Sequence, residues 1–307
     1  MKNIWKKTKY LRERIRLDKK TFLLYTVLRI LVILTAVRCF LTRNYEGFAL
    51  CLLSLILFLL PSFFEETLKL DIPPLFEGII YLFIYAAEIL GEVNHYYTAI
   101  PGWDTMLHTL NGFLCAAIGF SLVDILNRKS HRLNLSPLYL SFVAFCFSMT
   151  IGVIWEFIEF TCDQLFYLDM QKDFIVKTIG SVTLDPTHSQ IPVRISHITR
   201  TIIETADGKT YTVNGGYLDI GIIDTMKDLI VNFFGAVAFS VIGYFSVKNR
   251  DRKNGVINLA EDLRVRTLSD EELLKQREEI DRRLAESKEE RANLKNSLKR
   301  GGNKEDR

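Results

Sequence analysis

Three strongly apolar stretches of the chain carry acidic, imidazole and amide side chains at helical spacing. Residues three or four positions apart lie on the same face of a helix, so each stretch predicts a polar stripe on an otherwise apolar helix. The stripes are Asp104, His108 and Asn111 in WDTMLHTLNG, Glu156, Glu159 and Asp163 in IGVIWEFIEFTCD, and Asp224, Asp228 and Asn232 in DTMKDLIVNFFG. We interpret the three stripes as parts of one site.

The carboxylates and the imidazole in these stripes are typical ligands of a divalent metal ion. Oxygen-rich ligation with one imidazole suits Mg, Mn, Fe or Zn better than softer metals. Three helices of this kind would supply enough ligands for a two-ion centre like those of carboxylate-bridged helical bundles. The predicted metal ligands are Asp104, His108, Glu156, Glu159, Asp224 and Asp228. His108 and Glu156 are also the candidate catalytic residues, each as a ligand or a general base.

Acids near helix ends also have a plain structural interpretation. Asp104 and Asp224 begin their helices, where a carboxylate commonly caps the first turn. Asp163 lies where its helix ends, and there it can simply face headgroups and water. His108 and Asp228, by contrast, lie a turn or more inside their apolar runs, as Glu156 does. An ionisable side chain at such a depth favours a functional role.

The elements that would position these side chains are membrane spans. Hydrophobic residues make up 49% of the 307 residues, and several runs approach the roughly 20 residues that cross a bilayer. The predicted spans run from Thr21 to Leu41, Gly47 to Phe64, Pro73 to Leu90, Asp104 to Leu126, Leu138 to Phe160, and Asp224 to Val247. The predicted fold class is an all-α polytopic membrane protein with six transmembrane helices, a small extracytoplasmic β-hairpin insertion and a C-terminal cytoplasmic helix.

The distribution of lysine and arginine predicts the orientation. Nine of these residues stand in positions 1–20, before the first span, which places that end in the cytoplasm. Six spans then place the basic loop NRKSHR and the segment KNRDRK on the same side, although neither was used to choose it. The protein is therefore expected in the cell (plasma) membrane as a multi-pass protein with both termini cytoplasmic. This charge map argues against a nucleic-acid partner.

This topology gathers the acids of four spans at the outer leaflet. The expected set is Glu88, Glu92, Asp104, Glu156, Glu159, Asp163, Asp224 and Asp228. Among the same helix ends, Lys227 is the basic residue. Carboxylates packed together raise one another's pKa, so either several of them are protonated or a metal ion lies among them.

Two segments outside the spans have recognisable patterns. The extracytoplasmic loop 164–222 contains TRTIIETADGKTYTV, which alternates around Asp207 and Gly208 and predicts a β-hairpin. In the tail 248–307, Ser269 and Glu272 form a capping box before a charged helix over 270–299. Its interrupted heptad pattern allows a weak coiled coil, and thus self-association or a protein partner, but favours a solvated helix.

The ordered motifs W-D-x3-H-x3-G, W-E-x2-E and D-T-x2-D resemble the YjdF-like family of bacterial inner membrane proteins. They correspond to the stretches 103–112, 155–159 and 224–235, so the resemblance spans the membrane core from Glu77 to Val247. The loop 164–222 and the charged tail depart from that family's compact pattern. The resemblance implies a polytopic fold in which these acids and His108 form the shared site, and it implies no reaction.

Three functions fit the pattern of side chains. The first is a metal-dependent enzyme that hydrolyses or transfers a phosphoryl or acyl group of a lipid-linked substrate at the outer leaflet, with membrane lipids as partners. The second is a non-enzymatic protein that binds or senses a cation, or acts as a scaffold. The third is a cation transporter, which is less favoured because the inner halves of the last three spans offer little beyond Ser121, Asp124 and Ser240. Whether the protein is an enzyme is left open by the sequence.

Overall fold

The fold is taken from a computed structural model of the full chain. The structure describes residues 19–129, 134–248, 255–267 and parts of 269–286. The predictions for the basic N-terminal segment before residue 19, for half of the loop NRKSHR, for most of the segment KNRDRK, and for most of the tail helix lie outside the described residues. The chain divides into two compact units, and each is described by itself. Unit 1 comprises residues 1–107, 117–144 and 239–307, and unit 2 comprises residues 108–116 and 145–238.

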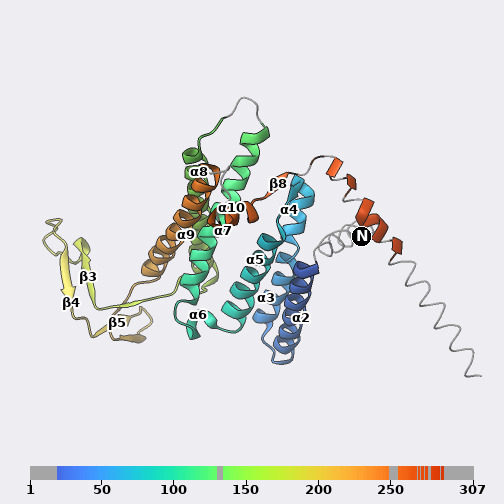
Figure 1. Ribbon diagram of the computed structural model, residues 1–307. Helices are drawn as coiled ribbons and strands as arrows, with labels where there is room; N and C mark the ends of the chain where they lie inside the picture. Colours follow the sequence, from blue (N-terminus) through green and yellow to red (C-terminus); the bar gives the residue numbers. More distant parts are fainter. Residues whose placement is uncertain are drawn as a thin grey trace, which may run out of the picture. The chain divides into compact units, whose positions relative to one another are not determined.

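Within the part of the chain that the structure describes, six segments of helix are long and apolar enough to cross a membrane, as the sequence predicted (Figure 1). Their bounds are Lys19–Leu41, Tyr45–Glu65, Pro74–Val93, Trp103–Arg128, Pro137–Phe166 and Ile222–Lys248. The predicted six-span membrane fold is thus confirmed, with ends within a few residues of the predicted ones except for the later end of the fifth span.

Unit 1 is built around α2 (Lys19–Leu41), α3 (Tyr45–Leu57) and α5 (Pro74–Ile84), with the short α4 (Leu60–Leu68) after α3. Its core contains an aromatic group made by Tyr25, Phe58 and Tyr81. The ring centroids of Tyr25 and Tyr81 lie 5.2 Å apart, and those of Phe58 and Tyr81 lie 5.7 Å apart. Such tilted aromatic pairs add specific packing to the burial of apolar area.

The third span continues from α5 into a π-helix, η1 (Tyr85–Val93), which periodicity did not predict. A π-helix bonds residue i to i+5, which displaces carbonyl groups from the regular helical ladder. The indole Nε1 of Trp103 donates to the carbonyl oxygen of Ala86 over 3.3 Å. The short α6 (Tyr96–Ala99) then leads to α7 (Trp103–Lys129).

Unit 2 contains the central part of α7, most of α8 (Pro137–Phe166) and the first part of α9 (Ile222–Lys248). Glycine allows these helices to approach closely. A Cβ atom at Gly112 would collide with the backbone oxygen of Asn232, and one at Gly235 would collide with that of Thr109. The hydroxyl of Ser148 donates to the carbonyl of Gly112 over 2.7 Å. Small residues and interhelical hydrogen bonds of this kind are typical of membrane helix packing.

Between α8 and α9, unit 2 carries three antiparallel strand pairs. The predicted hairpin is confirmed as β5 (Arg200–Glu204) and β6 (Thr210–Asn214), with Glu204 opposite Thr210 and Gly208 at positive φ in the turn. A second hairpin, β3 (Thr178–Ser181) with β4 (Val193–Ser196), encloses the 3-10 turn η2 (Val182–Leu184). The pair β2 (Ile175–Val176) and β7 (Tyr217–Leu218) closes the base of the insertion.

The part of unit 1 after α9 folds back onto the chain. Helix α10 (Gly255–Asp262) is followed by strand β8 (Arg266–Thr267), which pairs antiparallel with β1 (Leu70–Asp71). The predicted capping box is present, because Ser269 Oγ accepts from the amide of Glu272 while the Glu272 carboxylate accepts from Ser269.

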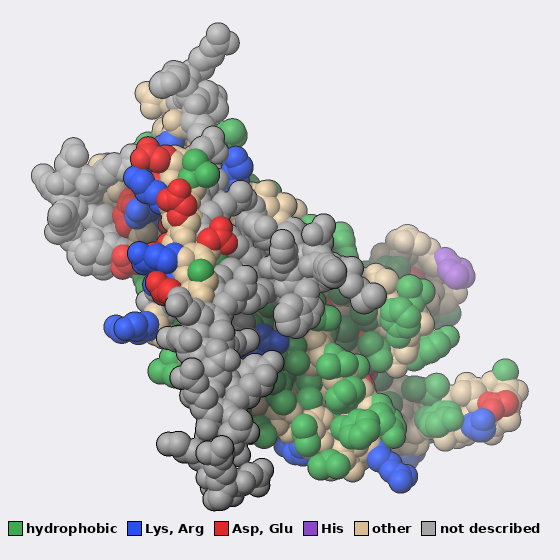
Figure 2. Space-filling model, turned by 90° about the vertical axis from the view of Figure 1, so that its right-hand side faces the viewer, with side chains coloured by type: hydrophobic (Ala, Val, Ile, Leu, Met, Phe, Trp, Pro, Cys, Tyr) green, Lys and Arg blue, Asp and Glu red, His purple; other side chains and the backbone are tan. Residues whose placement is uncertain are grey.

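The exposed surface of the spans is strongly apolar. On α2, Leu23, Ile30, Leu34 and Phe40 are each more than half exposed. Figure 2 shows hydrophobic side chains over a broad area of the described surface, with a cluster of Lys, Arg, Asp and Glu side chains at the upper left and further charged side chains near the lower and right-hand edges. Apolar patches of this extent mark a surface that water does not cover, which is the surface that a membrane protein presents to lipid.

Candidate metal centre

The imidazole of His108 lies between two buried carboxylates that come from two other helices. Its Nδ1 is 4.0 Å from Oε1 of Glu156 on α8, and its Nε2 is 4.0 Å from Oδ2 of Asp228 on α9. The His108 side chain is 13% exposed, whereas those of Glu156 and Asp228 are 5% and 2% exposed. All three residues belong to unit 2. Each ring nitrogen therefore faces an acid at a distance too long for a direct hydrogen bond.

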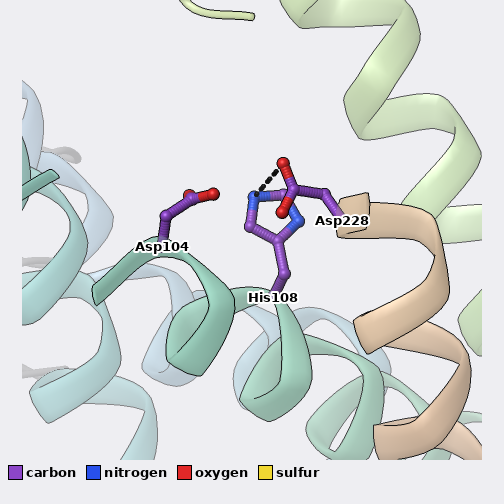
Figure 3. Close-up of side chains that lie close together, drawn as sticks. All are labelled: Asp104, His108 and Asp228. Atoms are coloured by element: carbon purple, nitrogen blue, oxygen red, sulfur yellow. Dashed lines mark ion pairs between the residues drawn. The ribbon is translucent and has the colours of Figure 1, made fainter. Parts of the chain in front are cut away.

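Asp104 precedes His108 by one turn of the same unbroken helix, so helical geometry directs both side chains to one face. One ligand atom from each of Asp104, His108 and Asp228 lies within 4.8 Å of the other two. Figure 3 shows these three side chains pointing toward one another, from α7 and α9. The arrangement offers two carboxylates and one imidazole, a donor set that suits hard or borderline divalent ions.

Two further predicted ligands have hydrogen-bond partners of their own. The carboxylate of Glu159 accepts from Nε1 of Trp155 over 2.7 Å, on the same helix. Oδ2 of Asp224 accepts from the backbone amide of Lys172 over 2.8 Å. Neither acid belongs to the group of three ligands, but both are buried. Their predicted role as metal ligands stays a prediction.

The loop 169–174 lies across the ends of α8 and α9 and is held there by the carboxylates of Asp163, Asp219 and Asp224. Asp163 accepts from the amides of Met170 and Gln171 over 2.7 and 2.9 Å. Asp219 accepts from the amide of Phe174 over 2.6 Å and from that of Ile223 in the first turn of α9 over 2.9 Å. Asp163 thus binds backbone amides of the loop rather than simply facing headgroups and water.

The acids around this loop also act on one another. Partial burial raises the pKa of Asp173, and the neighbouring charges of Asp169, Asp219 and Asp163 raise it further, while Lys172 opposes the shift. Like charges at short distance disfavour ionisation in this way. Asp173 therefore lies among negative charges that disfavour its ionisation.

Sequence reasoning missed the contacts that this loop makes, although one local signal was visible. The spacing of four positions between Trp155 and Glu159 places both on one helix face and allows the observed hydrogen bond. Lys172 and Gln171 gave no such signal, because their partners Asp224 and Thr225 lie more than 50 positions away. The third members of two stripes, Asn111 and Asn232, contact each other one turn deeper in the helices.

Exposed apolar side chains of α8 and α9 flank the buried acids of the candidate centre. On α8, Phe157 and Phe160 are 65% and 54% exposed although Glu156 and Glu159 beside them are buried. On α9, Ile230 and Phe234 are 51% and 62% exposed around the buried Asp228. The candidate centre therefore lies on helices whose other faces are suited to contact lipid.

Comparison with known proteins places the chain among predicted membrane proteins. The family model "Predicted membrane protein (DUF2238)" matches residues 22–191, which is more than half of the chain, and the resemblance to YjdF-like proteins is confirmed. An uncharacterized protein of Thermotoga maritima is 27% identical over 105 residues, covering 34% of this chain and 53% of that protein. The match thus spans about half the length of that relative. No solved structure matches the chain.

Proposed function

This chain belongs to the DUF2238 family of predicted membrane proteins, and we propose that it binds a divalent metal ion at His108 for hydrolysis or group transfer on a lipid-linked substrate. The observation that carries the proposal is the position of the imidazole between carboxylates from other helices. The ion would be Mg, Mn, Fe or Zn, in keeping with two carboxylates and one imidazole. The family match covers Asp104, His108 and Glu156 but ends before Asp228.

The distances support ligation by Nε2 of His108. Two ligand atoms that are each about 2.0 to 2.2 Å from one ion can lie at most roughly 4.3 Å apart. The separation of 4.0 Å between Nε2 and Oδ2 of Asp228 falls inside that limit. Asp104 offers the third ligand within 4.8 Å, which a small side-chain rotation would shorten. Three protein ligands leave coordination positions for water and substrate.

Glu156 faces the other ring nitrogen and takes a different role. A metal-ligating imidazole usually donates its second N–H to a carboxylate, which fixes its tautomer and orientation. Glu156 would do this through Nδ1 after closing their 4.0 Å separation by about 1 Å. Glu156 also remains the candidate general base, because it is buried beside His108 and would not itself be a ligand of the ion. The bound ion would polarise the scissile phosphoryl or acyl group and activate water.

We assign Glu159 and Asp224 to the surroundings of the ion. Glu159 is held by Trp155 and Asp224 by the amide of Lys172. Both acids add negative potential, which strengthens cation binding. Neither is needed to complete a site with three ligands.

A lipid-linked substrate is supported by the surroundings of the acids. Phe157 and Phe160 on α8 and Phe234 on α9 are exposed beside them. An apolar chain could lie along these faces while its polar head reaches the ion. The acids alone would repel an anionic head group. The bound metal ion would neutralise the charge of that head group.

The distribution of basic residues supports a location in the plasma membrane with both termini cytoplasmic. The metal centre would then lie near the outer surface, followed by the extracytoplasmic loop 164–222. Fusion of a reporter active only in the cytoplasm to the C-terminus tests this orientation: activity there supports it, and activity only for fusions within the loop contradicts it.

Metal content of the purified full chain tests the ion itself. About one equivalent of divalent metal is expected in the wild type, and a large loss in His108→Ala and Asp228→Asn. His197→Ala and Asp173→Asn are matched controls, because both side chains are exposed in the loop. Equal metal content in all five proteins would contradict the proposal. Melting temperature, measured in parallel, separates loss of ligation from unfolding.

Comparison of lipid extracts separates an enzyme from a cation sensor. Cells that carry His108→Ala in place of the wild type should accumulate a lipid-linked substrate if the protein is an enzyme. A sensor would lose metal in the same variant without any change in lipids. The sensing alternative is favoured by one observation, namely that α7 carries both His108 and the contacts of the C-terminal segment described next.

A further inference from the structure

Helix α7 carries two buried polar residues that the proposed metal centre does not use. Asp124 is 2% exposed and Ser121 is 1% exposed. At a rise of 1.5 Å per residue, Asp124 lies roughly 24 Å from His108 along the helix. Buried polar groups in proteins are expected to have partners, and both of these find them in a segment more than 130 positions further along the chain.

That segment begins in the last turn of α10 and contacts both residues within unit 1. The guanidinium of Arg264 pairs with the carboxylates of Asp124 and Glu261, and the Nε of Arg128 donates to Oδ2 of Asp124 over 2.9 Å. The backbone amide of Val265 donates to Oγ of Ser121 over 3.1 Å. The contacts thus combine a buried ion pair with a buried hydrogen bond.

Apolar burial and a short strand ladder complete the attachment. Ala260 and Leu263 are each 1% exposed and Val265 is 5% exposed. Directly afterwards, β8 pairs with β1 through two residue pairs, Asp71 with Arg266 and Leu70 with Thr267. The segment 260–267 is therefore bound to α7 on one side and to the connection between α4 and α5 on the other.

We propose that residues 260–267 form a strap that closes this side of unit 1 to water, with the pair Arg264 and Asp124 as its latch. A buried ion pair is costly to break, because each charge left without its partner remains desolvated. The strap should therefore have two states: closed with both charges paired, or open with both charges hydrated. Two ladder pairs alone would not hold it closed. The proposal does not depend on the metal centre.

The strap also gives a structural role to Ser121 and Asp124. These are two of the polar residues that a path for cations along this half of α7 would need. In the closed state both are bound to the C-terminal segment. By the charge distribution of the sequence this is the cytoplasmic side. The contacts would keep the membrane domain shut there.

Thiol labelling of Ala260→Cys in the solubilised full chain tests the strap. Ala260 is buried under the closed strap, so a hydrophilic maleimide reaches a cysteine there only after opening. Mass spectrometry of the peptide with residue 260 reports this site separately from the five native cysteines. Adding Arg264→Ala should raise the labelling rate at least about tenfold. Adding Arg282→Ala, which removes an arginine that lies outside the strap and is 67% exposed, should leave it unchanged.

Two further variants test the latch from the side of α7. Asp124→Asn should raise the rate as Arg264→Ala does, and Ser121→Ala should raise it by about two- to tenfold, since one buried hydrogen bond is lost. Equal rates for the Arg264→Ala and Arg282→Ala backgrounds, or fast labelling of Ala260→Cys alone, would overturn the proposal. If the charge variants do not fold, the labelling rate in Ser121→Ala is compared with that in Arg282→Ala, and equal rates overturn the proposal.

Discussion

The side-chain amide of Asn111 on α7 donates to Oδ1 of Asn232 on α9 over 3.2 Å, one turn below His108 and Asp228. Asn232 is 1% exposed, and its amide also points to the sulfur of Met149 on α8, 3.7 Å away. The pair therefore joins the two helices that carry the proposed ligands. Its position sets the register in which His108 meets Asp228.

The close approach of α7 to α9 at Gly112 predicts that Gly112→Ala destabilises unit 2. The added methyl group would collide with the backbone of Asn232, which cannot move as a flexible side chain would. Overpacking of this kind costs typically about 1 to 3 kcal/mol, so thermal unfolding of the variant should occur several degrees lower. Gly180→Ala is the matched control, because nothing lies within 4 Å of the added atom. Similar unfolding temperatures for the two variants would show that the helices are not tightly packed at Gly112.

The loop 169–174 is predicted to loosen in Asp163→Ala. This change leaves the amides of Met170 and Gln171 without the carboxylate that now accepts from both. Hydrogen bonds to charged groups contribute about 1.5 to 3 kcal/mol, so hydrogen exchange in the loop should accelerate at least about tenfold. Asp173→Ala removes an exposed acid whose neighbours are mostly acidic and should not accelerate it. Unchanged exchange in Asp163→Ala would mean that other contacts hold the loop.

The turn after η2 is predicted to loosen in acid. Hydrogen bonds from the side chains and amides of Ser189 and Thr187 hold the pKa of Asp185 well below its usual range. The stabilisation is thus complete above the ordinary aspartate pKa of about 3.9 and is lost as the pH falls below it toward the lowered value. Pepsin cleavage within 182–191 measures this, with Asp185→Asn as reference at each pH. Wild type should resist cleavage better than the variant at pH 4 to 5, and the difference should shrink toward pH 2.

A pH-independent ratio between the two proteins would contradict this role of Asp185. The comparison at equal pH removes the dependence of pepsin itself on acidity. The turn lies in the insertion between α8 and α9, apart from the proposed ligands in sequence, so metal content serves as an independent check that the membrane part is intact.

The membrane spans and the grouping of three site residues were predictable because they follow from local regularities. Long apolar runs define the six helices, and a spacing of four positions places Asp104 and His108 on one face. Topology then brings the start of the last span to the same level, which is how Asp228 was included. The turn at Asp207 and Gly208 also has a purely local signal, and the hairpin there is confirmed.

The remaining features depend on contacts between distant residues or on small energy differences. The carboxylate of Asp224 binds the amide of Lys172, 52 positions away. The spacing within its stripe could not indicate this partner, so the stripe suggested only that Asp224 is a metal ligand. Arg264 meets Asp124 across 140 positions. The π-helix Tyr85–Val93 has no residue pattern that separates it from an α-helix, and the indole of Trp103 bonds to its Ala86 carbonyl from 17 positions away.

The central claim is that Nε2 of His108 ligates a divalent ion while Glu156 lies outside the ligand shell. The most direct measurement is the nitrogen hyperfine coupling of Mn²⁺ bound to the purified full chain, observed by electron paramagnetic resonance. We predict a coupling to one imidazole nitrogen that is absent in His108→Ala, retained in Glu156→Gln and unchanged in His197→Ala. Bound Mn²⁺ whose nitrogen coupling survives in His108→Ala, or no bound Mn²⁺ in the wild type, would contradict the account.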